Sequence, residues 1–169
     1  MKIKVNDIVR IAVIAALYAT FTIVQGDLAF LGIQFRVAEV FNLLAFINPI
    51  YGMGVILGCF LSNLYSPIIM DMVFGTLATA LSVFFISRSK NIFIASLYPV
   101  IINAIIIGFE LYFAYQLPLI LTIIQVATGE FIVVCIIGNM LFRFILKNKA
   151  LISILGISEK HKEFTKIQR

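Results

Sequence analysis

The sequence predicts an all-α integral membrane protein, a bundle of six transmembrane helices with the N and C termini in the cytoplasm. Three observations lead to this fold class: 62% of the 169 residues are hydrophobic, only 12% are charged, and the mean hydropathy is +1.10. A soluble domain is about half apolar and about a quarter charged, so this chain could not cover a water-facing surface. At about 20 residues for each crossing, its length provides for roughly six helices.

The first two helices are bounded by polar residues and by proline. We expect the first helix to be capped by Asp7 and to end at Val24, before a polar loop over residues 25–36. No small-residue cleavage site follows it, which favours a retained helix over a signal peptide. The next helical stretch, 37–48, is short because Pro49 ends it.

Two further prolines mark where later helices begin, since proline is well tolerated in the first helical turn. Pro67 and Pro118 divide the remaining apolar sequence, together with a charged turn after residue 86. The predicted helices are 50–65, 67–86, 92–115 and 118–146. We expect one transmembrane domain over residues 1–147 and a polar cytoplasmic tail over 148–169.

Basic residues near helix ends predict the orientation, because Lys and Arg are retained on the cytoplasmic side of a membrane. With six crossings, three basic groups fall on one side of the bilayer: Lys2, Lys4 and Arg10; Arg88 and Lys90; Lys147 and Lys149. The opposite side carries only Arg36. The basic residues form no stripe interleaved with exposed aromatics, so we expect a lipid bilayer rather than nucleic acid as the surrounding partner.

Acidic residues within the predicted helices are the main candidates for a functional site. An acid in hydrocarbon costs about 2.5–3.5 kcal/mol on insertion scales and therefore needs a partner or a water-lined cavity. Five polar residues on separate helices share one depth in the outer half of the bilayer: Glu39, Asn63, Asp71, Glu110 and Gln125. Glu130 and Asn103 lie nearer the midplane of the bilayer. They could form the floor of the same cavity or a separate hydrogen bond between helices.

This distribution favours a solute pocket open to the outside over helix contacts alone, although any one of these residues could serve only to join helices. Arg36 can pair with Glu39 along a helix turn, which leaves an excess of carboxylates. An anionic solute would be repelled, whereas a planar solute rich in N–H donors or carrying an ammonium group would fit. Aromatic residues of similar depth could stack on a ring, Phe74 among them.

The sequence lacks catalytic signatures. It contains no phosphate-binding loop, no HExxH and no GxSxG, and its one histidine, His161, lies in the tail. Cys59 and Cys135 stand in apolar runs without a CxxC motif, so we expect packing residues and no metal site. We therefore predict no enzyme activity, no cofactor and no metal; any ATP hydrolysis would belong to a partner.

Small residues form stripes on two helices. Ala12, Ala15, Ala16 and Ala19 give overlapping small-xxx-small pairs, and Gly54, Gly58 and Ser62 line one helix face. Such faces allow helices to approach closely. The alanine face is compatible both with internal packing and with docking of another membrane subunit.

Three segments resemble a known family: 34–39 (QFRVAE), 54–63 (GVILGCFLSN) and 71–79 (DMVFGTLAT). They are similar to the queuosine-precursor transporter family (QueT), substrate-binding S components of energy-coupling factor (ECF) importers. The resemblance implies capture of a 7-deazaguanine such as preQ1 or queuine at the outer face. It also implies a transmembrane scaffold subunit docked on the alanine face and two cytoplasmic ATPases that supply the energy.

The expected substrate-binding residues come from two sources. Motif matches give Arg36, Glu39, Asn63 and Asp71, whereas depth alone gives Glu110 and Gln125. Two alternatives stay open: an S component for another flat, donor-rich solute, such as a vitamin or an aromatic amino acid, and a non-transport membrane protein with a structural role. A membrane enzyme would need a nucleophile, a metal cluster or an acid-base pair, which a single tail histidine does not supply.

Overall fold

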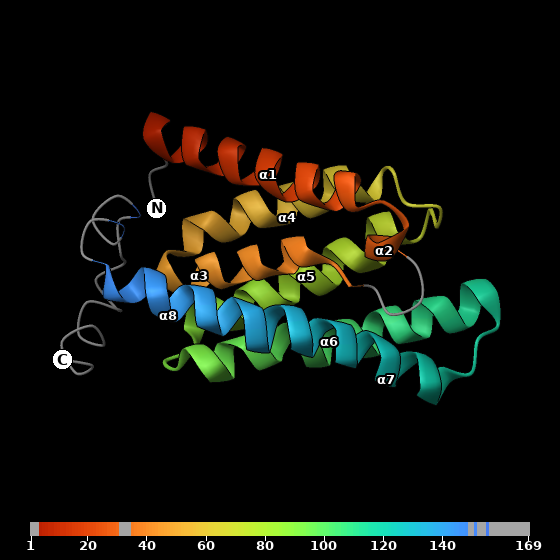
Figure 1. Cartoon of the computed structure of the whole chain (residues 1–169). Helices are drawn as coiled ribbons and strands as arrows, with labels where there is room; N and C mark the ends of the chain where they lie inside the picture. Colours follow the sequence, from red (N-terminus) through yellow and green to blue (C-terminus); the bar gives the residue numbers. More distant parts are fainter. Residues whose placement is uncertain (1–3, 31–34, 149–150, 152–154, 156–169) are drawn as a thin grey trace.

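The computed structural model describes residues 4–30, 35–148, 151 and 155, which form an all-helical bundle (Figure 1). The predicted fold class is thus confirmed as all-α. Some predicted features lie outside the described residues: Lys2 at the start of the chain, Gln34 in residues 31–34, and His161 in the tail. In chain order the helices are α1 (Val5–Gln25), α2 (Asp27–Phe30), the 3₁₀ helix η1 (Val37–Leu43), α3 (Leu44–Ile47), α4 (Pro49–Asn63), α5 (Asp71–Arg88), α6 (Ile92–Tyr115), α7 (Leu119–Glu130), the π-helix η2 (Phe131–Gly138) and α8 (Asn139–Lys147).

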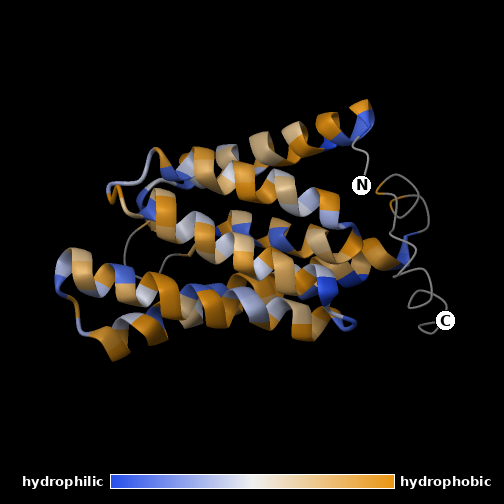
Figure 2. Ribbon diagram, turned by 180° about the vertical axis from the view of Figure 1, so that it is seen from behind, coloured by the Kyte–Doolittle hydropathy of each residue, from blue (hydrophilic) through white to orange (hydrophobic). Residues whose placement is uncertain are grey.

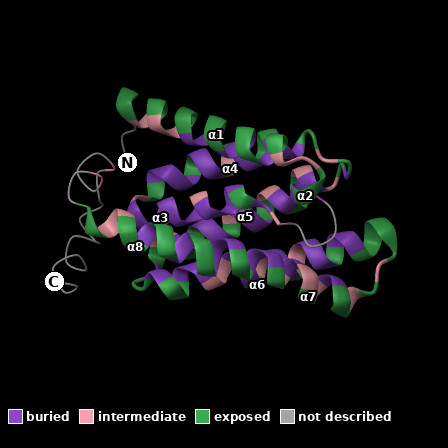
Figure 3. Ribbon diagram, in the orientation of Figure 1, coloured by how far each residue is buried: buried purple, intermediate pink, exposed green. Residues whose placement is uncertain are grey.

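Four helical stretches are long and apolar enough to cross a membrane: α1, α5, α6 and the continuous stretch Leu119–Lys147. The segments Val37–Ile47 and Pro49–Asn63 are apolar but shorter. Hydrophobic residues occur along the whole length of the helices (Figure 2). The exposed residues lie on the outward faces of the helices (Figure 3). Six crossings, with both termini in the cytoplasm, stay a prediction.

The predicted cap of α1 was right in part, and one predicted helix start was wrong. Lys4 rather than Asp7 is the N-cap of α1, and Asp7 in the first turn accepts a hydrogen bond from the Lys4 backbone N–H at 3.0 Å. The helix expected from Pro67 begins only at Asp71. The Ser66 hydroxyl accepts from the Ile68 N–H at 3.1 Å, and this local hydrogen bond favours a turn over a helix.

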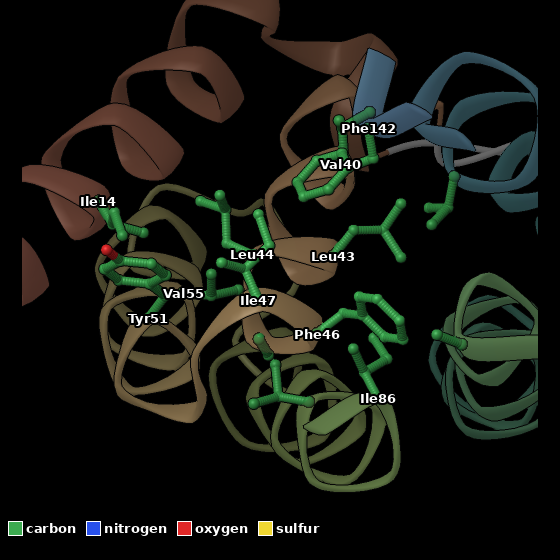
Figure 4. Close-up of a cluster of buried hydrophobic side chains, with 14 of the residues drawn as sticks. Ile14, Val40, Leu43, Leu44, Phe46, Ile47, Tyr51, Val55, Ile86 and Phe142 are labelled. Atoms are coloured by element: carbon green, nitrogen blue, oxygen red, sulfur yellow. The ribbon is translucent and has the colours of Figure 1, made fainter. Parts of the chain in front are cut away.

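The η1–α3 segment lies at the centre of the bundle. Leu43, Ala45 and Ile47 are buried, and Figure 4 shows this segment enclosed by side chains from α1, α4, α5 and α8. In a membrane bundle, side chains packed in this way are held by dispersion contacts between the helices. A polar residue on this segment is therefore held inside the protein, and Glu39 is one.

The alanine face of α1 is divided between the interior and the surface. Ala15 and Ala19 are buried, whereas Ala12 and Ala16 are exposed. α1 packs mainly on α4, where a Cβ added at Gly58 would lie 2.7 Å from the Ala15 carbonyl oxygen and from the Tyr18 Cβ. Internal packing is thus the observed role of Ala15 and Ala19.

The described basic residues of the three predicted groups collect at one end of the bundle. The start of α1, the turn between α5 and α6, and the end of α8 lie together there (Figure 1). They carry Lys4 and Arg10, Arg88 and Lys90, and Lys147. We call this the basic end. The connections from α4 to α5 and from α6 to α7 lie at the opposite end.

Candidate functional site

The centre of the candidate site is Glu39, a buried carboxylate on η1 that is 1% exposed. Its Oε1 accepts a hydrogen bond from the Tyr18 hydroxyl of α1 and lies 3.9 Å from Arg36 Nη1. Its Oε2 accepts from Asn42 Nδ2, one turn further along η1. The predicted pairing of Arg36 with Glu39 is confirmed, and two donors complete the surroundings of the carboxylate.

Arg36 is held by the short helix before it. Its Nε donates to the Ala29 carbonyl at 3.2 Å, and its guanidinium carbon lies 5.2 Å from the centre of the Phe30 ring. A cation over an aromatic face is favourable. Nη2 is buried and has no partner in the protein.

Asn63 and Asp71 close the connection between α4 and α5. Asn63 Nδ2 donates to the Asp71 backbone carbonyl at 2.8 Å, and Asp71 Oδ2 accepts from the Ser66 hydroxyl. Gly75 leaves the necessary room, because a Cβ there would lie 2.8 Å from Asn63 Nδ2. The second oxygen of each side chain, Asn63 Oδ1 and Asp71 Oδ1, is buried without a partner.

Cys59 joins these two halves of the site. Its sulfur accepts from Thr79 Oγ1 at 3.2 Å and from Asn63 Nδ2 at 3.4 Å, and it lies 3.9 Å from Arg36 Nη1. Its thiol donates to the Gly75 carbonyl at 3.7 Å. The sequence suggested only a packing residue, so the polar role of Cys59 is a correction.

Glu110 on α6 is 2% exposed, and both of its carboxyl oxygens lack a partner in the protein. It interacts electrostatically with Asp71 and Arg36 and lies within hydrogen-bonding reach of the Asp71 carboxyl group, so it belongs to the same group. Glu130 instead accepts from Asn103 Nδ2 at 2.6 Å. This is the interhelical hydrogen bond named above as one of two options, although the carboxyl also interacts electrostatically with Glu39 and Arg36.

Two expected site residues lie apart from these contacts. Gln125 is half-buried on α7, and within the described chain no hydrogen bond joins it to the others. Phe74 is 37% exposed on α5. The structure therefore brings together Arg36, Glu39, Asn63, Asp71 and Glu110, which we call the polar cluster.

The sequence model of the QueT transporter family matches residues 8–147. This chain belongs to the QueT transporter family. A relative from Lactococcus lactis subsp. cremoris (strain MG1363), described as "Queuosine precursor transporter QueT", is 35% identical over 148 residues, which cover 77% of this chain and 86% of the relative. No solved structure shows a significant similarity.

Membership of the QueT family confirms the predicted location. The chain is a multi-pass membrane protein from a family of transporters rather than of enzymes. No group of three or more residues suited to bind a metal occurs in the part of the chain that the structure describes.

Sequence reasoning missed several polar partners in this QueT protein, among them Tyr18, Asn42 and Thr79. Tyr18 had a detectable signal, because it shares a helical stripe with Ala15, Ala19 and Thr22, all of them buried. Asn42 lies three residues after Glu39, within reach along one helical turn. Thr79 had no such signal, since it contacts the cluster only through Cys59 on another helix.

The QueT cluster leaves an unusual number of polar atoms without partners. They are Arg36 Nη2, Asn63 Oδ1, Asp71 Oδ1, Glu110 Oε1 and Glu110 Oε2. Buried polar groups are nearly always hydrogen-bonded, and each unsatisfied one costs about 1–3 kcal/mol. One donor and several acceptors thus remain available to a bound molecule.

Proposed function

We propose that this chain is the substrate-binding subunit of an ECF-type importer and that it captures a queuosine precursor at the outer face of the membrane. The substrate would be a 7-deazaguanine such as preQ1 or queuine. The main support is the set of unpartnered buried polar atoms in the polar cluster. Membership of a family described as QueT transporters supports the same conclusion.

The chemistry of a 7-deazaguanine complements these atoms. Its ring N–H and exocyclic amine are donors for Asp71 Oδ1 and Asn63 Oδ1, which lack them. Its carbonyl oxygen is an acceptor for Arg36 Nη2, the donor without a partner. Gln125 and Phe74 lie outside the polar cluster, so they would border the ligand without holding it.

The proposed importer needs further subunits, namely a transmembrane scaffold and two cytoplasmic ATPases. The exposed Ala12 and Ala16 on α1 are the remaining small residues for docking the scaffold, because Ala15 and Ala19 are buried inside this chain. The charge sorting supports an arrangement in which the basic end faces the cytoplasm and the polar cluster faces outward.

Ligand binding by the purified protein tests this function. We expect 7-deazaguanines to raise the thermal unfolding midpoint, because a ligand that binds only the folded state stabilises it by mass action. Glu39→Gln and Asp71→Asn should weaken binding while the protein still folds. Normal binding by both variants would exclude this site.

The same assay separates the alternatives. If a vitamin or an aromatic amino acid stabilises the protein and the 7-deazaguanine does not, the proposed substrate is wrong. The proposed role as an S component then still stands. If the two variants lose stability and no candidate solute binds the wild type, a structural role is the better explanation.

A further inference from the structure

Asp71 and Glu110 are the part of the polar cluster in which negative charge lacks compensation. We propose that these two carboxyl groups form the subsite for an ammonium group on the substrate, and that they share one proton when the site is empty. This inference rests on the proposed function, because it assigns a place to the charged substituent of the substrate.

The balance of buried charge supports this assignment. In the described chain four buried carboxyl groups, those of Glu39, Asp71, Glu110 and Glu130, accompany a single buried cation, Arg36. A buried charge without a partner is very unfavourable, so the excess must be neutralised by protons or by a cation.

The four carboxyl groups differ in how they are held. Glu39 has Arg36 beside it and accepts hydrogen bonds from two side chains, and Glu130 accepts one from Asn103. Asp71 accepts one, from Ser66, and its carboxyl group lies within hydrogen-bonding reach of the Glu110 carboxyl group. Apart from each other, Asp71 Oδ1 and the two Glu110 oxygens have no partner in the described chain.

Two atoms that are not acidic point to a ligand at the same place. Asn63 Oδ1 and Arg36 Nη2 are buried and unpartnered, in side chains that are 2% and 4% exposed. Asn63 is bonded to the backbone of Asp71, and Arg36 interacts electrostatically with both Asp71 and Glu110. A flat, polar ring between these atoms would place its substituent beside the acidic pair.

The protonation follows from the surroundings of the pair. The charged or titratable groups that interact with the pair or with the residues next to it are Arg36 and Glu39 at η1, Tyr18 on α1, Cys59 on α4 and Glu130 on α7. Arg36 is the one cation among them, and it is already paired with Glu39. Two neighbouring carboxyl groups that share one site do not both ionise readily. An entering ammonium group allows both to ionise, and the shared proton leaves to the solvent.

The test compares two ligands that differ in this substituent, 7-aminomethyl-7-deazaguanine, which carries an ammonium group, and its uncharged 7-cyano analogue. Titration calorimetry of the full chain in detergent, in two buffers of different ionisation enthalpy, measures affinity and proton release together. We expect about one proton to be released by the ammonium ligand and none by the nitrile. Affinity for the ammonium ligand should rise with pH, by up to tenfold for each unit, while the empty pair still holds its proton.

Variants locate the effect. Glu110→Gln should lower the affinity for the ammonium ligand at least tenfold and change the affinity for the nitrile by less than threefold. Asp71→Asn should lower both affinities, because Asp71 also accepts from the ring donors, but the loss should be at least tenfold larger for the ammonium ligand. Glu130→Gln is the matched control, since it alters a buried carboxyl group that is bonded to Asn103 and should leave the ratio of the two affinities unchanged.

The outcomes separate the two proposals. Failure of the wild type to bind either ligand would overturn the proposed function. Binding of both ligands without proton release, or with equal effects of all three substitutions, would overturn only the subsite. If Asp71→Asn and Glu110→Gln fail to fold, the wild type alone still tests the subsite. Its affinity for the ammonium ligand should rise with pH, and binding should release a proton.

Discussion

At the scale of single residues, Glu39 illustrates how a carboxylate is kept inside a membrane bundle. Tyr18 and Asn42 each donate to one of its oxygens, and the Arg36 guanidinium lies alongside. Together they provide the partners without which a buried carboxylate would be strongly destabilising. Removing one of these donors should therefore lower the free energy of unfolding, even though Arg36 still pairs with Glu39.

We expect Tyr18→Phe to lower the free energy of unfolding by about 1.5–3 kcal/mol, the usual contribution of a hydrogen bond to a charged group. Thermal unfolding in detergent measures the change. Tyr65→Phe is the matched control, because Tyr65 is 69% exposed. Equal midpoints for the two variants would show that the Tyr18 hydroxyl does not support Glu39.

Gly75 determines where Asn63 lies. An added methyl group at Gly75 would meet Asn63 Nδ2 and break its hydrogen bond to the Asp71 carbonyl. Gly75→Ala should thus weaken ligand binding at least tenfold, as measured by titration calorimetry. Adding Asn63→Ala should remove the clash and restore stability without restoring affinity, whereas additive losses of stability would contradict the clash.

At the scale of helices, the contact between α1 and α4 depends on small residues on both sides. Gly54 and Gly58 allow the α1 backbone to approach, since a Cβ at Gly54 would lie 2.7 Å from the Ile11 carbonyl oxygen. Dispersion contacts and small residues are the usual means of close helix packing in membranes. Tyr18 is on the same face of α1, so this contact also positions the donor to Glu39.

The two neighbouring residues Ala15 and Ala16 should respond differently to enlargement. Ala15→Leu should destabilise the protein by about 1–3 kcal/mol, because Ala15 is buried against α4 and overpacking forces the helices apart. Ala16→Leu should leave stability and ligand binding unchanged, since Ala16 is exposed. Thermal unfolding and ligand binding of the two variants provide the comparison.

Ala16 has a second expected effect if the scaffold subunit docks there as proposed. Uptake of the ligand by whole cells should then fall in Ala16→Leu although the purified variant still binds the ligand. Unchanged uptake would remove Ala16 from the docking surface.

At the scale of the whole molecule, charge is sorted along the bundle axis. The described basic residues of the helix starts and ends gather at the basic end, and the polar cluster lies near the connection between α4 and α5 at the other end. The positive-inside rule then predicts a cytoplasmic basic end.

Labelling by a membrane-impermeant maleimide tests this orientation. Gln116→Cys, in the connection between α6 and α7, should react in intact cells, whereas Lys90→Cys should react only after the membrane is permeabilised. The background should be low because Cys59 and Cys135 are both buried. The reverse pattern would invert the orientation and place the polar cluster toward the cytoplasm.

Local sequence determined the features that depend on neighbours within one helix. The helix expected at 92–115 coincides with α6, Ile92–Tyr115, because a long, mostly apolar stretch between polar turns leaves little choice. The pairing of Arg36 with Glu39 was predictable for the same reason, since the two residues are one helical turn apart. Membrane residence followed from composition alone.

Only the tertiary structure decided which side chains from different helices meet. Tyr18 reaches Glu39 across 21 positions of sequence, and Cys59 contacts Thr79 from another helix. These contacts depend on how each helix is rotated about its axis, which also placed Ala15 inside and Ala16 outside. Apolar periodicity is weak when lipid surrounds a bundle, because the outer face is as hydrophobic as the core. The rotation is therefore set by packing between helices, and with it the composition of the polar cluster.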